Sequence, residues 1–128
     1  MPKRVLIAGG LAAAVLLFNL ATAGPAAAHA ELRTAEPADH AVLLRAPTRL
    51  ALTFTAPMQV TRLRLLDEAG KEYPLSREGS RQASVSEVRA AIAQPLPPGA
   101  YRVEYRGLSS DGHVGSGMLH FRVDPTAR

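Results

Sequence analysis

Four segments of the chain alternate between apolar and polar residues with a period of two, at 49–55, 60–67, 100–107 and 117–123. On one side of these segments stand Leu50, Leu52 and Phe54, then Leu63 and Leu65, then Tyr101, Val103 and Tyr105, and finally Leu119, Phe121 and Val123. Strict alternation is typical of strands that bury one face. We therefore predict four strands whose listed side chains enter a common core.

Clusters of turn-forming residues separate the alternating segments: Glu36–Asp39, Ala56–Pro57, Glu68–Gly70, Pro95–Gly99 and Ser109–His113. Short strands that recur every 8–12 residues or so indicate a sandwich or a barrel. Only segment 84–94 is ambiguous, since it fits a helix or a strand with a bulge. The pattern predicts one all-β domain of about seven strands.

The first 28 residues have the organisation of a secretory signal peptide. A basic start at Lys3 and Arg4 precedes an uncharged apolar stretch at 5–23, and small residues end the segment at Ala26–Ala28. The apolar stretch approaches the length of about 20 residues that a membrane anchor needs. Its internal glycines, its asparagine and the A-x-A ending favour cleavage instead. We predict a signal peptide at 1–28 and an exported mature domain at 29–128.

Charge and cysteine content narrow the function classes. The net charge is +4, but Lys3 and Arg4 fall in the leader, so the mature domain is close to neutral. Its arginines are scattered among acidic and apolar residues, which disfavours binding to nucleic acid. The absence of cysteine means that the exported domain folds without disulfides. No second long apolar segment follows the leader, so we expect a soluble domain, with a monomer as the default.

Cleavage after Ala28 would make His29 the first residue of the mature chain. Its free α-amine and its imidazole Nδ1 could then close a chelate ring on one metal ion. Metal ions compete with protons for both groups near neutral pH, because their ordinary pKa values are about 7.7–8 and 6.5. The alternative is that His29 is an arbitrary first residue.

Two further donors stand in the turn 109–113, where Asp111 and His113 flank Gly112. Asp-Gly is also a common turn signal, and a lone loop histidine is often only exposed. With His29 the pair would complete three nitrogen donors and one carboxylate oxygen. Such donors in a plane suit Cu(II), whereas zinc prefers a tetrahedron.

The mature chain resembles the CopC family of periplasmic copper-resistance proteins. The matching motifs are "HAEL", "EPADHAVL", "LTFTAP", "PLPPGAYRVEYRGLSSDGH" and "SGMLHFRV", and together they cover nearly all of 29–128. The resemblance implies an immunoglobulin-like or cupredoxin-like Greek-key β-sandwich in the periplasm. It also implies one Cu(II) ion held by His29, Asp111 and His113, and a CopD-type inner-membrane importer as partner.

Two departures from the family pattern concern other donors. Some relatives have a methionine-rich loop for Cu(I), but the mature chain has only Met58 and Met118, which makes such a site doubtful. Met118 and His120 share one strand face and could form a weak soft site with Met58 or His40. We expect instead a surface Met118 and a solvated His120, and His40 is a poor ligand candidate because related chains often have a small turn residue there.

Three functions fit these residues. The first is a non-enzymatic carrier or buffer of Cu(II), and the second is a copper-dependent oxidative enzyme with an N-terminal histidine brace. The third is a metal-free scaffold, which a β-sandwich also allows. A filled four-donor plane favours the carrier, because metal catalysis needs an open position. Groups that orient His113 are expected among Glu31, Ser109 and Ser110.

Overall fold

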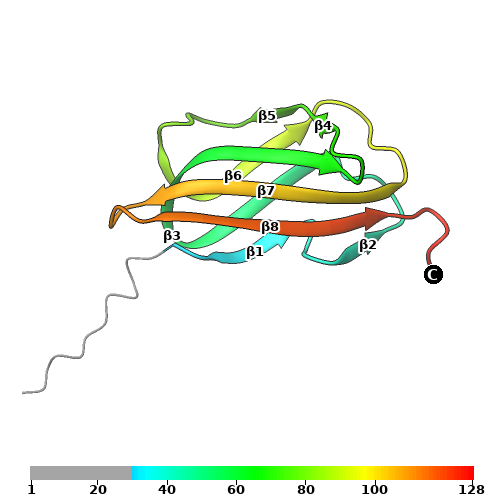
Figure 1. Ribbon diagram of the computed structural model, residues 1–128, viewed down its shortest axis with the longest axis horizontal. Coiled ribbons are helices and arrows are strands. Elements are labelled where there is room, and N and C mark those ends of the chain that lie inside the picture. The colour runs from blue at the N-terminus through cyan, green and yellow to red at the C-terminus, as the bar shows by residue number, and fades with distance from the viewer. Residues whose placement is uncertain (1–29) are drawn as a thin grey trace, which may run out of the picture.

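The computed structural model describes residues 30–128 as a β-sandwich (Figure 1). The strands are β1 (Leu32–Glu36), β2 (Ala41–Leu43), β3 (Arg49–Asp67), β4 (Glu72–Tyr73), β5 (Leu75–Arg77), β6 (Ser84–Ile92), β7 (Gly99–Ser109) and β8 (Val114–Val123). No helix able to cross a membrane occurs in this part of the chain. The predicted all-β class is confirmed, with eight strands where about seven were expected.

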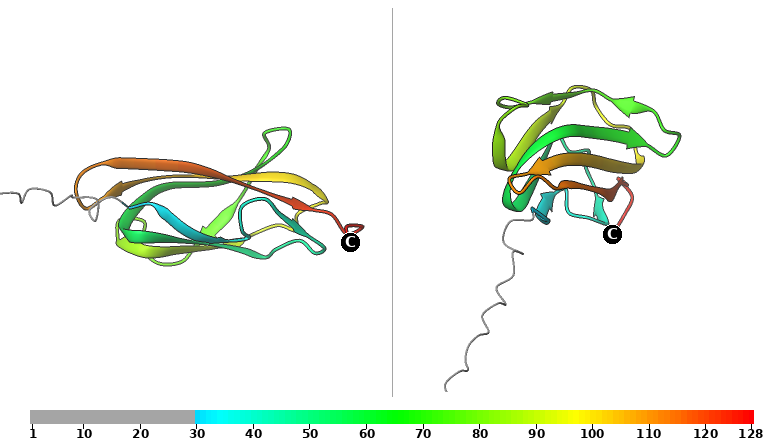
Figure 2. Two further views of the ribbon diagram at one scale, coloured as in Figure 1. Left: turned by 90° about the horizontal axis from the view of Figure 1, so that it is seen from below. Right: turned by 60° about the vertical axis from the view of Figure 1, so that its left-hand side comes forward.

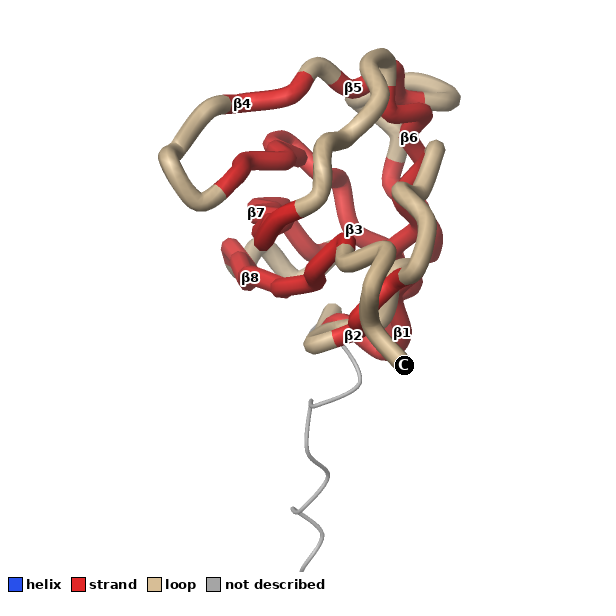
Figure 3. Tube along the Cα trace, turned by 90° about the vertical axis from the view of Figure 1, so that its right-hand side faces the viewer, coloured by secondary structure: helices blue, strands red, loops and turns tan. Residues whose placement is uncertain are grey.

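The long strand β3 belongs to both layers of the sandwich. Its first part, at 49–54, lies between β1 and β6, while its second part, at 58–67, pairs mainly with β7 and β4. The sheet order β2-β8-β7-β3-β6-β5 therefore curls over at the middle of β3. Figure 2 shows the two layers from the side, and Figure 3 shows the strands closing around the core from one end.

The core is built from the residues that the alternation selects. Leu50, Leu52, Phe54, Leu65, Tyr101, Val103, Leu119, Phe121 and Val123 are all buried, and Leu63 and Tyr105 pack against them. Alternate residues of β8 point outward, including Met118 and His120. The predicted inward faces of the four segments are thus confirmed.

One predicted connector is wrong. Ala56–Pro57 does not separate two strands but lies inside β3, where the pairing with β6 is interrupted between Thr53 and Met58. A proline cannot donate to a ladder, so it is tolerated where a strand bends away from its partner. The turn-forming residues lie where β3 passes from one layer of the sandwich to the other. The ambiguous segment 84–94 forms strand β6, not a helix.

Candidate metal centre

The turn between β7 and β8 holds Asp111 and His113 in fixed positions. The Ser109 amide donates to the carbonyl of His113 at 2.9 Å, and the Gly112 amide donates to the carbonyl of Ser109 at 3.0 Å. Gly112 has a φ of 87°, in the left-handed region that glycine enters without a steric penalty. The backbone thereby brings residues 111 and 113 to one side of the turn.

The Asp111 carboxylate contacts the His113 imidazole directly. Nδ1 of His113 lies 2.9 Å from Oδ2 of Asp111, and the His113 amide donates to Oδ1 at 3.1 Å. The Asp111 side chain is 19% exposed, whereas the His113 side chain is 67% exposed. A neutral imidazole that carries its proton on Nδ1 has its metal-binding lone pair on Nε2. A metal-bound histidine usually donates its other N–H to such a carboxylate. In the other tautomer the lone pair of Nδ1 lies 2.9 Å from Oδ2, a separation that lets both atoms bind one ion.

Ser109 is the group that fixes Asp111. Its side chain is buried at the end of β7, and its hydroxyl donates to Oδ1 of Asp111. This hydrogen bond, and those from the His113 amide and ring, hold the pKa of the Asp111 carboxyl well below its ordinary value against the opposing effect of desolvation. The carboxylate is therefore anionic across the range in which imidazoles gain and lose protons.

Removing the Ser109 hydroxyl should raise the pKa of Asp111. In a Ser109→Ala variant we expect this pKa to move toward its ordinary value, as followed by carboxyl ¹³C NMR during an acid titration. Ser110→Ala, an exposed neighbour, is the matched control and should leave the pKa unchanged. An Asp111 pKa that is the same in Ser109→Ala as in the parent would contradict this role.

The same contacts make stability depend on pH. The pKa of Asp111 is lower in the folded chain than in the unfolded chain, where it lies near 4. The ionised carboxylate therefore stabilises the fold at any pH above about 4. The contribution is lost as the pH falls through the folded pKa. The urea midpoint of the Ser109→Ala variant should accordingly be lower than that of the parent at neutral pH, and the difference should narrow in strong acid. The part that remains comes from the bond of the Ser109 hydroxyl to the His113 carbonyl.

The described chain begins at the same end of the sandwich as this turn (Figure 1). The Glu31 amide donates to the Thr55 hydroxyl at 3.0 Å, and the Thr55 amide donates to the Glu31 carbonyl at 2.8 Å. The carbonyl oxygen of Ala30 lies 3.7 Å from the point where a Cβ on Gly115 would stand. Ala30 is thus beside the second residue of β8, two positions after His113.

The structure brings together two of the three predicted ligands. Asp111 and His113 are in contact, while His29 lies outside the described residues, as does the predicted signal peptide. Among Glu31, Ser109 and Ser110, the Ser109 side chain hydrogen-bonds to Asp111, and Glu31 is bound to Thr55 through its backbone. Within 30–128, no three side chains of His, Cys, Asp or Glu form a ready-made metal site.

The methionines do not gather around a soft metal site. Met58 is fully buried in β3, and its thioether packs in the space left by Gly107 and Gly115. Met118 is 49% exposed on the outer face of β8. Met58 and Met118 therefore face opposite sides of the sheet, which excludes the soft site that would have joined them. His120 is exposed, as predicted, and its neighbour is His40.

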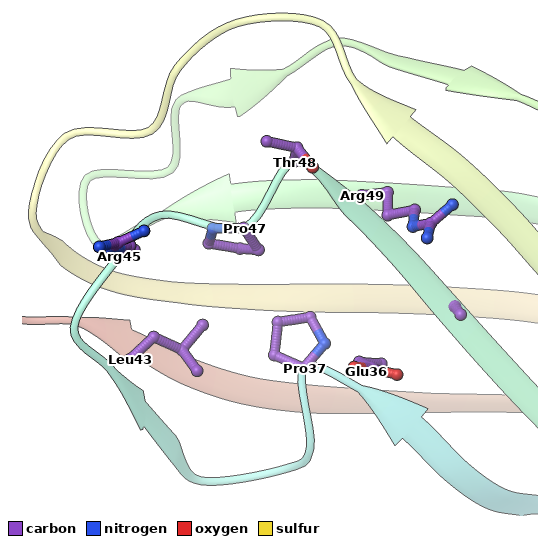
Figure 4. A pocket seen from close by; sticks show the side chains of 8 residues that line it. Glu36, Pro37, Leu43, Arg45, Pro47, Thr48 and Arg49 are labelled. Atoms are coloured by element: carbon purple, nitrogen blue, oxygen red, sulfur yellow. The ribbon is translucent and has the colours of Figure 1, made fainter.

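A hollow of about 310 Å³ lies at the other end of the sandwich, between the end of β1 and the chain that enters β3 (Figure 4). Its charged lining residues are Glu36, Arg45 and Arg49, and it contains no imidazole. One carboxylate beside two guanidinium groups is a poor environment for a cation. This hollow is therefore not a candidate metal site.

Comparison with known proteins agrees with this fold. The model of the CopC domain family matches residues 32–124. "Copper resistance protein C" of Escherichia coli is 30% identical over 130 residues, which cover 94% of this chain and 96% of that protein. The crystal structure of CopC from Methylosinus trichosporium OB3b superposes with a TM-score of 0.65 at 28% identity, covering 78% of this chain and 98% of that chain.

A longer protein also matches. "Copper transport protein CutJ" of Bacillus subtilis (strain 168) is 22% identical over 111 residues, and the match covers 85% of this chain but only 20% of that protein. The fold and the turn together define a small β-sandwich with an acid–imidazole pair beside the start of its first strand. This chain belongs to the CopC family.

Proposed function

We propose that this chain is a non-enzymatic Cu(II)-binding protein that holds one copper ion after export to the periplasm. Signal peptidase cleaves after Ala28, and the mature domain 29–128 begins with His29. The amine and imidazole of His29, the Asp111 carboxylate and the His113 imidazole supply four donors. The observation that carries the proposal is the Asp111–His113 contact at the end of the sandwich where Ala30 lies.

Membership of the CopC family and the names of the relatives support copper as the ion. Nitrogen and carboxylate donors together favour Cu(II), which lies at the top of the divalent affinity order. The first residue of the mature chain is also close to the described chain. Neighbouring Cα atoms across a trans peptide are about 3.8 Å apart, so the Cα atom of residue 29 is one such step from that of Ala30. The protein then acts in copper homeostasis or resistance, as a soluble monomer that sequesters the ion or delivers it to a CopD-type importer.

A copper-dependent oxidative enzyme is the less favoured function. Enzymes that act on polysaccharides stack aromatic rings on their substrate, and they keep coordination positions open. Here Phe54, Tyr73, Tyr101 and Phe121 are all buried, and Tyr105 packs against the core. Within 30–128 this leaves no flat aromatic surface beside the turn, and Asp111 would fill a position on the metal.

Acidification should release the copper. Imidazole and amine nitrogens bind a metal ion only after losing their protons, so protons displace copper below the imidazole range, near pH 6. Asp111 stays anionic there, so release follows the nitrogen donors. We expect one tight equivalent of Cu(II) at pH 7.5 and nearly complete release by pH 4, measured by dialysis and metal analysis. Copper retained at pH 3 would show that other ligands hold it.

A further inference from the structure

A second group of metal-binding side chains lies toward the far end of β8 from the turn 109–113. His40 directly precedes β2, which runs parallel to β8 with Ala41 opposite Phe121. One step back in this register, His40 stands opposite His120. The His40 amide donates to the carbonyl of His120 at 2.6 Å, so the backbone itself keeps the two histidines side by side.

Asp39 links both histidines. Its Oδ1 accepts the His120 amide at 2.9 Å, and its Oδ2 lies 3.4 Å from Nε2 of His40. The imidazoles of His40 and His120 are nearly parallel, with ring centroids 6.1 Å apart and an interplanar angle of 13°. The side chains of His40 and Asp39 are 80% and 44% exposed, so both can change rotamer in solvent. We call Asp39, His40 and His120 the β2–β8 cluster.

The backbone at His40 is unusual. Its φ of 67° is the only left-handed value at a non-glycine position in residues 30–128. Histidine is one of the few side chains enriched in that region, although glycine adopts it with no steric penalty. The sequence thus keeps an imidazole at a position that suits glycine, and this conformation presents the ring next to His120.

The separation of the rings fits a shared ion. Two imidazoles bound to one ion, with metal–nitrogen distances of about 2.0–2.1 Å, place their centroids roughly 4.5–6.5 Å apart, depending on the angle between them. The observed 6.1 Å falls in this range. Ligand lone pairs lie in the ring plane, so the nearly parallel rings must turn until their planes meet at the ion. The exposed His40 ring can make this rotation without disturbing the core.

The surrounding charges are mixed. Asp67 and Glu68 line a shallow hollow together with His120 and add negative charge. Arg102 lies opposite His120 on β7, but its guanidinium is bound to Glu104 at 2.8 Å. Arg122 lies on the same outward face of β8, two residues along. The carboxylates of the cluster and its hollow offset the two guanidinium groups.

From these contacts we propose that the β2–β8 cluster is a second site for a divalent transition-metal ion. Two imidazoles and a carboxylate bind Cu(II) more tightly than Zn(II) or the other divalent first-row ions in the general affinity order. The site is weaker than the one proposed around His113, because its ligands are exposed and must turn to converge. His120 lies six residue steps after Val114, which places the two sites about 20 Å apart along β8. The second site therefore binds its ion independently.

The test uses Cu(II) as the probe and NMR to locate it. A background that combines Asp111→Ala and His113→Ala with one additional residue before His29 removes three of the four donors of the proposed first site, and amide signals are recorded as Cu(II) is added. We expect selective paramagnetic broadening at residues 39–41 and 119–121. Adding His40→Gly, which suits the backbone, should weaken this binding at least tenfold or so, which is about 1.4 kcal/mol. His120→Thr, which removes the other imidazole from an outward strand position, should do the same.

Met118→Leu is the matched control, since it lies on the same face of β8 and contains no imidazole. It should leave the broadening and the affinity unchanged. Broadening that is absent, or that survives both His40→Gly and His120→Thr, would overturn the second site. Either result leaves the first site unaffected, because binding there is measured separately in the chain with Asp111 and His113 intact.

Discussion

A form of the protein that keeps one additional residue before His29 is expected to bind Cu(II) at least a thousandfold or so more weakly than the form that begins at His29. The added peptide bond converts the α-amine into an amide and removes both a nitrogen donor and the chelate ring. A thousandfold loss corresponds to about 4 kcal/mol. Competition with a chelator of known affinity measures it directly.

The fold should not change in this experiment. The Glu31 amide donates to the Thr55 hydroxyl and the Thr55 amide donates to the Glu31 carbonyl, and an added residue leaves both bonds in place. Equal urea midpoints for the two metal-free forms would confirm that only the donor set differs. Equal copper affinity in the two forms would contradict the proposed role of His29.

Replacing His113 with alanine should weaken Cu(II) binding about a hundredfold or more, which corresponds to about 2.8 kcal/mol. The change removes one imidazole donor and also the partner that Asp111 contacts at 2.9 Å. His120→Ala is the matched control, because it removes an exposed histidine from the same hairpin. This variant should bind its one tight equivalent of Cu(II) with the same affinity as the parent.

Asp111→Asn separates two contributions of the carboxylate. If Asp111 binds the ion, losing its charge should weaken binding and alter the Cu(II) spectrum. If it only orients His113, an effect of about tenfold with an unchanged spectrum is expected. A His113→Ala variant that binds copper as tightly as the parent would exclude the turn as the metal centre.

The alternating segments could be predicted because a strand that buries one face has apolar residues at every second position of its sequence. In β8 the burial follows this pattern: Leu119, Phe121 and Val123 are buried, and Met118 and His120 are exposed. The pairing of strands is less visible. Ala56–Pro57 carries a turn signal, yet β3 continues through it, since nothing local shows that one strand serves both layers.

The residues of the candidate metal centre could be predicted from the sequence, but the hydrogen bonds between them could not. Asp111 and His113 could be selected from their spacing, whereas Ser109 could not be distinguished from Ser110. That choice depends on which serine ends β7 facing inward. The adjacency of His40 and His120 was likewise hidden, because β2 is only three residues long and pairs with a strand far along the chain.

We propose that one Cu(II) ion binds the N-terminal histidine and the turn at 111–113 together. The most direct measurement is the electron paramagnetic resonance spectrum of the one-equivalent Cu(II) complex of the chain that begins at His29. We predict a tetragonal signal with nitrogen splittings that changes both in His113→Ala and in the form with one additional N-terminal residue. A signal that both variants retain unchanged would contradict it.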